Sequence, residues 1–277
     1  MKYFESITCL IIVLLFLLSG CNNPRNNNNN KEAIPTIKVP DVGAQDGLYV
    51  ENIDGLFDTI QFIRLETDSN CLIGEIMKIE FFEEKFFILD SDVTKTLFCF
   101  DRNGGFLFKI NNIGKGPGEF ISPVDFSIND QKKELSLLDV GSQKIITYNL
   151  NGTFIKEINY VDKFGAIDIS HLHMDGDLTY AMLDKPELSC DNFIKIYDGT
   201  KEVSGSFKID KYNWNIPSGF SSRFSRNTNP MFLYVSKTSD TIYSINKYEF
   251  KPFYYIDFQG MKVCYENINP KLSYYEK

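Results

Sequence analysis

The chain has 277 residues with a formal net charge of −8 at neutral pH, and hydrophobic residues make up 43% of it. An acidic balance disfavours nucleic acid and anionic membrane surfaces as partners, because both bind basic patches. The length and composition suffice for one domain with a large hydrophobic core.

The N-terminus carries an apolar run from Cys9 to Leu18, preceded by Lys2. The run is shorter than the about 20 residues that a transmembrane helix needs, so it predicts a secretory signal over residues 1–20. The sequence Leu18-Ser19-Gly20-Cys21 resembles the lipobox of bacterial lipoproteins. This resemblance implies that Cys21 becomes the first mature residue and is lipidated, and several acyl chains anchor a protein stably in a membrane. The alternative is an ordinary signal peptide with an incidental cysteine.

Residues 21–47 are rich in Asn and poor in apolar residues, so we expect a flexible tether with no core of its own. Residues 48–277 are expected to form the folded domain. Four cysteines remain there, Cys71, Cys99, Cys190 and Cys264, and they lack any CxxC spacing. We expect most of them to be buried thiols rather than metal ligands or redox pairs.

Short runs of Phe, Ile, Leu, Tyr and Val, separated by Asn, Asp and Gly, predict an all-β domain. Three units repeat at a spacing of about 46 to 48 residues, which is typical of propeller blades. Each has an apolar strand that ends in Asp, then another strand, then a turn that contains glycine. The strand-end residues are Asp90, Asp139 and Asp184, and the turns are Asn103-Gly104, Asn151-Gly152 and Asp198-Gly199. A fourth, degenerate unit has Lys247-Tyr248 at the turn.

Each repeated position has a physical reason. Glycine supplies the positive backbone φ of two-residue hairpin turns, which we place between the third and fourth strands of a blade. The strand-end Asp is expected to accept hydrogen bonds from backbone amides of the following turn. The runs FFILD and LSLLD are apolar on both faces, as expected for inner strands between neighbouring blades.

The order GKGPGEF at Gly114–Phe120, then Asp125-Phe126 and Asp139, resembles NHL-type repeats. The region from Phe57 to Phe258 more closely resembles the six-bladed β-propeller lipoproteins of Bacteroidetes. Further residues carry this resemblance, namely Leu65-Glu66-Thr67, Ile73-Gly74-Glu75-Ile76 and Asp90. The resemblance implies an exported propeller whose biochemical role is poorly defined.

The region is too short for six blades, since about 40–50 residues per blade give four to five. We therefore expect a propeller that is incomplete at its C-terminus, with an early strand at Ile60–Leu65 that lacks its C-terminal partner. A shorter complete propeller is the alternative. Acidic residues just after the lipidated cysteine promote surface display in organisms of this kind, and here the tether is Asn-rich with Lys31-Glu32. We thus expect an outer-membrane lipoprotein on the periplasmic face.

Motifs for catalysis and cofactors are sparse. The segment Gly114–Gly118 lacks the ending of a phosphate-binding loop, and Pro117 removes one backbone donor, so we interpret it as an inter-blade connector. His171 and His173 have a spacing that places both on one face of a strand, but the chain holds no third His. We expect no metal, no cofactor and no catalytic residue, and interpret Asp175-Gly176-Asp177 as a turn.

The best ligand-binding candidates lie in the irregular segment Tyr212–Met231, and they are Trp214, Arg223 and Arg226. An aromatic ring flanked by guanidinium groups can stack on a sugar or hold an acidic glycan. The alternative is that Trp214 packs between blades.

Two functions remain open. The first is a lipid-anchored binding or scaffold module that holds a glycan, a peptide or a protein. The second is a propeller hydrolase or lyase that acts on polysaccharide or peptide, since paired carboxylates cannot be located from sequence. We favour the first.

Overall fold

The computed structural model describes residues 34–38, 59–165, 169–183, 194–206, 223–226, 232–235 and 241–257. Residues 35–277 form one compact unit and residues 1–34 another, and the architecture below is that of the former. The predicted signal sequence, Cys21 and most of the predicted tether lie outside the described residues.

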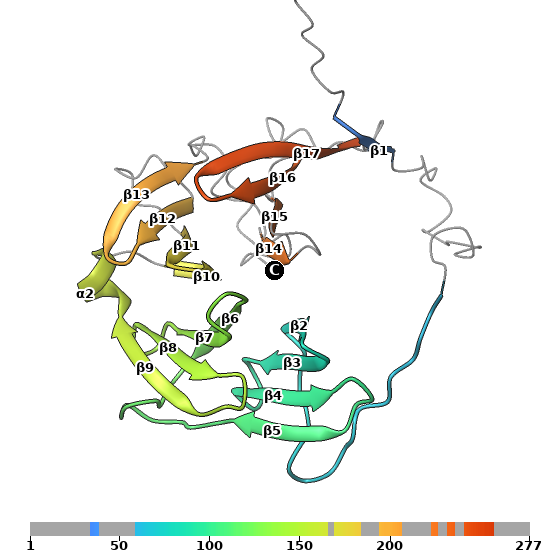
Figure 1. The fold of residues 1–277 in the computed structure, drawn as a ribbon. Helices are drawn as coiled ribbons and strands as arrows, with labels where there is room; N and C mark the ends of the chain where they lie inside the picture. Colours follow the sequence, from blue (N-terminus) through green and yellow to red (C-terminus); the bar gives the residue numbers. More distant parts are fainter. Residues whose placement is uncertain are drawn as a thin grey trace, which may run out of the picture. The chain divides into compact units, whose positions relative to one another are not determined.

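The described strands form four sheets, each built on four strands that follow one another along the chain (Figure 1). We call them blades 1 to 4. Blade 1 holds β2 (Lys78–Phe82), β3 (Lys85–Asp90), β4 (Thr96–Asp101) and β5 (Phe106–Ile110). Blade 2 holds β6 (Pro123–Asn129), β7 (Glu134–Asp139), β8 (Lys144–Asn149) and β9 (Phe154–Asn159), followed by the short helix α2 (Tyr160–Phe164). Blade 3 holds β10 (Ile169–Asp175), β11 (Leu178–Leu183), β12 (Ile194–Asp198) and β13 (Lys201–Ser206). Blade 4 holds β14 (Arg223–Arg226), β15 (Phe232–Val235), β16 (Thr241–Asn246) and β17 (Glu249–Asp257).

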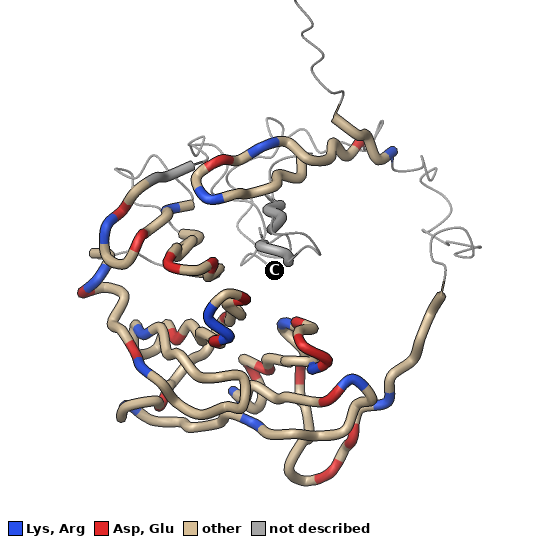
Figure 2. Tube along the Cα trace, viewed as in Figure 1, with Lys and Arg blue, Asp and Glu red and all other residues tan. Residues whose placement is uncertain are grey.

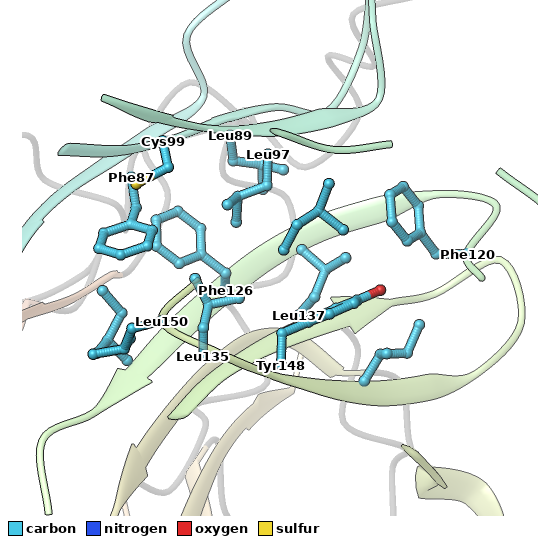
Figure 3. Close-up of a cluster of buried hydrophobic side chains, with 13 residues drawn as sticks. Phe87, Leu89, Leu97, Cys99, Phe120, Phe126, Leu135, Leu137, Tyr148 and Leu150 are labelled. Carbon is cyan, nitrogen blue, oxygen red and sulfur yellow. The ribbon is translucent and has the colours of Figure 1, made fainter. Parts of the chain in front are cut away.

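Successive blades pack face to face through apolar side chains. Between blades 1 and 2, side chains of β3 and β4 point toward those of β6, β7 and β8 (Figure 3). This cluster contains Phe87, Leu89, Leu97, Cys99, Phe126, Ile128, Leu135, Leu137, Ile146 and Tyr148. A second cluster joins blade 2 to blade 3 through Leu138, Ile145, Leu172 and Ala181, and a third joins blade 3 to blade 4 through Tyr180, Ile196 and Ile245. Four-stranded sheets packed in this sequence are those of a β-propeller, which confirms the expected fold class.

The second strand of a blade is buried on both faces, as FFILD and LSLLD predicted. On β3, Phe87 contributes to the cluster with blade 2, whereas Ile88 contributes to a cluster on the opposite face that includes Cys71 and Phe98. Cys71 and Cys99 are buried free thiols, as predicted, and Cys190 and Cys264 lie outside the described residues.

The hairpin turns fall between the third and fourth strands, as predicted, but in blades 1 and 2 they are not two-residue turns. Gly104 has a φ of 90°, and its N–H donates to the carbonyl of Asp101 at 3.0 Å. Asn103 is not among the residues with positive φ. A type I turn followed by one left-handed glycine explains this geometry, and Gly152 (φ 81°) repeats it in blade 2. In the degenerate fourth unit Lys247 itself takes a φ of 52°.

The strand-end aspartates cap turns as expected. The carboxylate of Asp90 accepts hydrogen bonds from the backbone N–H groups of Gly74, Glu75, Val93 and Thr94 at 2.8–3.2 Å. Asp139 does the same for Ile121, Ser122, Gly141 and Ser142, at 2.6–3.3 Å. Each carboxylate thereby fixes both the entry into its blade and the turn after β3 or β7. Asp184 lies outside the described residues.

The expected strand at Ile60–Leu65 is wrong, because these residues form no strand. The chain there follows blade 1 instead, and the Glu66 N–H donates to the Gly104 carbonyl at 2.8 Å. An earlier segment, β1 (Thr36–Lys38), adds a fifth strand to blade 4. It pairs in parallel with Tyr255–Asp257 of β17.

Candidate functional site

The first strands of the blades, β2, β6, β10 and β14, are the innermost strands in Figure 1. Three side chains of β6 bond to the backbone of β10 and of Gly176, the residue that follows this strand. Asp125 accepts from the Leu172 N–H at 2.7 Å, Ser127 accepts from the Met174 N–H at 2.9 Å, and Asn129 accepts from the Gly176 N–H at 3.2 Å. Asn129 also donates to the Gly176 carbonyl at 2.8 Å. We call this set the inner-strand ladder.

The ladder provides hydrogen-bond acceptors for backbone N–H groups on the edge of β10 that does not pair with β11. A first strand pairs with its sheet along one edge only, so its other edge carries free N–H and C=O groups. Side chains at every second position of β6 point to the same face, which lets them meet every second N–H of β10. Each ladder bond joins residues 47 positions apart, so the ladder follows the blade repeat.

Lys78 of β2 lies at the blade 1 end of the ladder. Its ammonium donates to the Asp125 carboxylate at 2.8 Å and to the Phe126 carbonyl, and it pairs with Glu80 at 3.1 Å. Burial alone would lower the pKa of Lys78, but the carboxylates of Asp125 and Glu80 outweigh burial and raise it. An ammonium has three N–H donors, so these three acceptors occupy all of them. Lys78 is therefore a structural cation that joins two blades.

Both histidines lie on the strand β10, as their spacing predicted. The His173 ring lies 5.8 Å from the ring of Tyr180. Burial, with a smaller effect of the Lys78 ammonium, lowers the pKa of His173 to about 3, so its imidazole is neutral at physiological pH. In the described ranges, no group of three or more His, Cys, Asp or Glu side chains could hold a metal ion.

The turns after β2, β6 and β10 carry charged residues (Figure 2). Lys132 pairs with Asp177 at 2.7 Å, and Lys133 pairs with Glu83 at 2.7 Å, so the turn of blade 2 is tied to the turns of both neighbours. Asp175-Gly176-Asp177 begins the β10–β11 turn, as predicted, with Gly176 at a φ of 57°. These exposed side chains give this end of the first strands a mixed acidic and basic surface.

The glycine-rich segment Gly114–Gly118 connects blade 1 to blade 2, as predicted. The Glu119 carboxylate accepts from the Gly116 N–H at 2.7 Å, and Phe120 is completely buried. The Gly118 N–H donates to Glu157 at 2.9 Å, while its carbonyl accepts from the Tyr148 hydroxyl at 2.9 Å. The conformation is thus fixed by bonds within the protein, which explains the GPGEF pattern without a phosphate ligand.

The structure describes only two of the three predicted ligand-binding residues. Trp214 lies outside the described residues, and the backbone of Arg223 and Arg226 forms the ends of β14, which contacts β10. From the sequence, Asp125 was named only as part of the family resemblance, and its pairing with Lys78 was missed. The repeat contained a signal for this pair, because Lys78 and Asp125 are 47 residues apart, which is the spacing of successive blades.

Residues 35–277 match the family described as "Domain of unknown function (DUF4934)", and the chain belongs to this family. No curated protein matches the chain.

Among solved structures, a protein named "Putative exported protein" from Bacteroides fragilis NCTC 9343 is 21% identical, with a TM-score of 0.62. The match covers 82% of this chain and 61% of that one, so the chain spans about three fifths of its length. A DUF4221 family member from Bacteroides vulgatus ATCC 8482 is 11% identical, with a TM-score of 0.45 over 68% of this chain and 59% of that one. The β-propeller domain of Cps50 (Swd1) from Myceliophteria thermophila is 13% identical, with a TM-score of 0.39 over 64% and 53%.

No helix within the described ranges is long and apolar enough to cross a membrane.

Proposed function

We propose that this propeller is a binding or scaffold module of the bacterial cell envelope, anchored by lipid at Cys21 and located at the periplasmic face of the outer membrane. The lipobox-like sequence before Cys21 supports the anchor. The likeness in fold to a Bacteroides fragilis protein that carries an exported designation supports the compartment. The ligand is a glycan, a peptide or a partner protein held at the inner strands.

The observation that carries the binding role is the position of Arg223–Arg226. This segment is the first strand of blade 4, and it contacts β10, which carries both histidines. Guanidinium groups recognise carboxylate and sulfate groups through paired hydrogen bonds. With Trp214 nearby in sequence, the arrangement suits an acidic glycan.

None of the described carboxyl groups with a resolved pKa shift has the raised pKa of a catalytic acid. A glycoside hydrolase needs one carboxylic acid whose pKa is raised, so that it is protonated before it donates to the leaving group. Among the described residues, every Asp and Glu with a resolved shift, namely Asp68, Asp90, Glu157, Asp177 and Glu249, has a lowered pKa. These groups stay ionised and act as hydrogen-bond acceptors or ion-pair partners.

Binding is tested with immobilised polygalacturonate as the acidic probe and dextran as the neutral one. We expect retention on polygalacturonate that the double variant Arg223→Ala/Arg226→Ala weakens at least about tenfold, the equivalent of about 1.4 kcal/mol. Arg102→Ala is the matched control, because Arg102 is an exposed arginine at the outer turn of blade 1. Release of reducing ends from either probe would instead support the hydrolase or lyase.

The anchor is tested by labelled palmitate. We expect incorporation into the wild-type chain and none into Cys21→Ser. Label that persists in Cys21→Ser would refute lipidation at this residue.

A further inference from the structure

The short strand β1 joins blade 4 from outside the four-stranded repeat. It pairs in parallel with the last three residues of β17, Tyr255–Asp257, at the outer edge of the sheet (Figure 1). The Tyr255 N–H also donates to the Pro35 carbonyl at 3.0 Å. β1 lies within residues 21–47, the predicted tether, so part of that segment belongs to the compact unit of residues 35–277.

The pairing of β1 gains little from burial. All three of its residues are exposed, and Ile37 is 47% exposed, whereas β3 buries four of its six residues. Parallel pairs are slightly less stable per residue than antiparallel ones, and ordering a segment costs conformational entropy. Segments with few buried apolar contacts open at a lower free energy than the whole domain. β1 can therefore detach while the blades stay folded.

The place of β1 along the chain gives its detachment a consequence. Thr36 lies 15 positions after Cys21, whereas Glu66, which bonds to Gly104 of blade 1, lies 45 positions after Cys21. An extended chain spans at most about 3.4 Å per residue. The chain can thus span at most about 50 Å between Cys21 and blade 4 when β1 is paired. When β1 is detached, it can span at most about 150 Å between Cys21 and blade 1.

We propose that β1 is a releasable strap that sets how far the propeller can move from the lipid at Cys21. The inference rests on the proposed function, because it needs the lipid anchor. Paired with β17, the strap keeps blade 4 close to the membrane. Released, it lets the domain reach a ligand about three times as far away. A pull on the tether favours release, because the released chain is the longer one.

The pairing is tested in the full-length Cys21→Ser chain, where no lipid takes part. Ile37→Pro removes a backbone N–H from the middle of β1, and the matched control Ile37→Ala removes side-chain atoms but keeps that N–H. We expect amide exchange of Tyr255 to be at least about fivefold faster in Ile37→Pro than in Ile37→Ala, with the same urea midpoint in both. Equal exchange at Tyr255 in the two variants would overturn the proposal.

The distance is tested with the lipidated full-length chain in phosphatidylcholine vesicles, in which a fraction of the headgroups carries a fluorescent acceptor. A donor dye replaces Tyr248, which is 47% exposed in the turn between β16 and β17. Energy transfer falls steeply with distance. Because the permitted span triples, we expect transfer to be at least about twofold weaker in Ile37→Pro than in Ile37→Ala.

The failure of the anchor and the failure of the strap are distinguishable. A wild-type chain that does not bind the vesicles would refute the anchor at Cys21, and the strap with it. Vesicle-bound Ile37→Pro and Ile37→Ala chains with equal energy transfer would refute the strap and leave the anchor standing.

Discussion

The carboxylate of Asp125 on β6 accepts a hydrogen bond from the backbone N–H of Leu172 on β10 at 2.7 Å, while its other oxygen accepts from Lys78 on β2 at 2.8 Å. One side chain thus bonds to the first strands of the two neighbouring blades. Lys78, Asp125 and Leu172 are separated by steps of 47 residues, which is the spacing of the blade repeat. The two bonds therefore join equivalent strands of successive blades.

Removal of Asp125 should strongly destabilise the fold. Its side chain is 3% exposed and that of Lys78 is 21% exposed, so Asp125→Ala leaves a largely buried ammonium without its main partner. We expect the free energy of unfolding to fall by about 3 kcal/mol, measured by urea denaturation. The control is Glu84→Ala, which breaks an exposed pair with Arg102 and should change stability by less than about 1 kcal/mol. Equal effects of the two substitutions would contradict the role given to Asp125.

Two turn glycines should differ in their tolerance of a side chain. A Cβ at Gly152 would lie 2.7 Å from two ring carbons of Phe108, and the residue has a φ of 81°. Gly199 has a φ of 59°, but a Cβ there would meet no atom within 4 Å. We expect Gly152→Ala to cost about 2–4 kcal/mol, from backbone strain and crowding together, and Gly199→Ala to cost about 1 kcal/mol from strain alone. A larger loss of stability for Gly199→Ala than for Gly152→Ala in urea denaturation would contradict this expectation.

Acid should weaken the fold through Asp90. Burial alone would raise the pKa of this carboxyl, but hydrogen bonds from the N–H groups of Gly74, Thr94, Val93 and Glu75 lower it below the usual 3.8. Because the folded-state pKa is the lower one, the stabilisation is present above about pH 4 and is lost as pH falls through the folded-state value. We expect Asp90→Asn to be less stable than wild type at pH 7, with a difference that shrinks toward pH 3. A constant difference in urea midpoint across this range would show that ionisation of Asp90 is irrelevant.

His173 should remain neutral where an ordinary histidine titrates. With its pKa lowered from 6.5 to about 3, its folded form disfavours the proton, so its contribution to stability is complete above pH 6.5 and declines as pH falls toward 3. In an NMR titration between pH 8 and pH 5 we expect constant imidazole shifts for His173, assigned by their loss in His173→Gln. A midpoint near 6.5 would mean that the ring is solvated.

The sequence predicted those features that are local in the chain. Asp90 and Asp139 end strands and are followed by the turns they cap. The residue type and its place at the strand end were therefore sufficient to predict the capping role. Gly104 and Gly152 were placed in the correct turns, although the turn type was wrong because a glycine alone does not distinguish one left-handed residue from two. The buried second strands followed from their lost alternation of apolar and polar residues.

Contacts between blades could not be assigned in the same way. Asp125 and Leu172 meet only because two sheets pack in a fixed register, and no local pattern reports that register. The parallel pairing of Thr36–Lys38 with β17 was missed since three residues are too short for a periodic signal. The expected strand at Ile60–Leu65 had strand composition, but its backbone follows blade 1 rather than a sheet edge. The predicted ligand residue Trp214 lies outside the described residues.

The account depends on first strands that are joined by side chains at the blade repeat, and amide hydrogen exchange of Leu172 and Met174 tests this most directly. Both N–H groups bond to β6 side chains, at 2.7 and 2.9 Å, so we expect both to be protected in the wild-type protein. Ser127→Ala should then accelerate exchange at Met174 and leave Leu172 protected. Rapid exchange of both amides in a folded wild-type protein would contradict the blade packing on which the account rests.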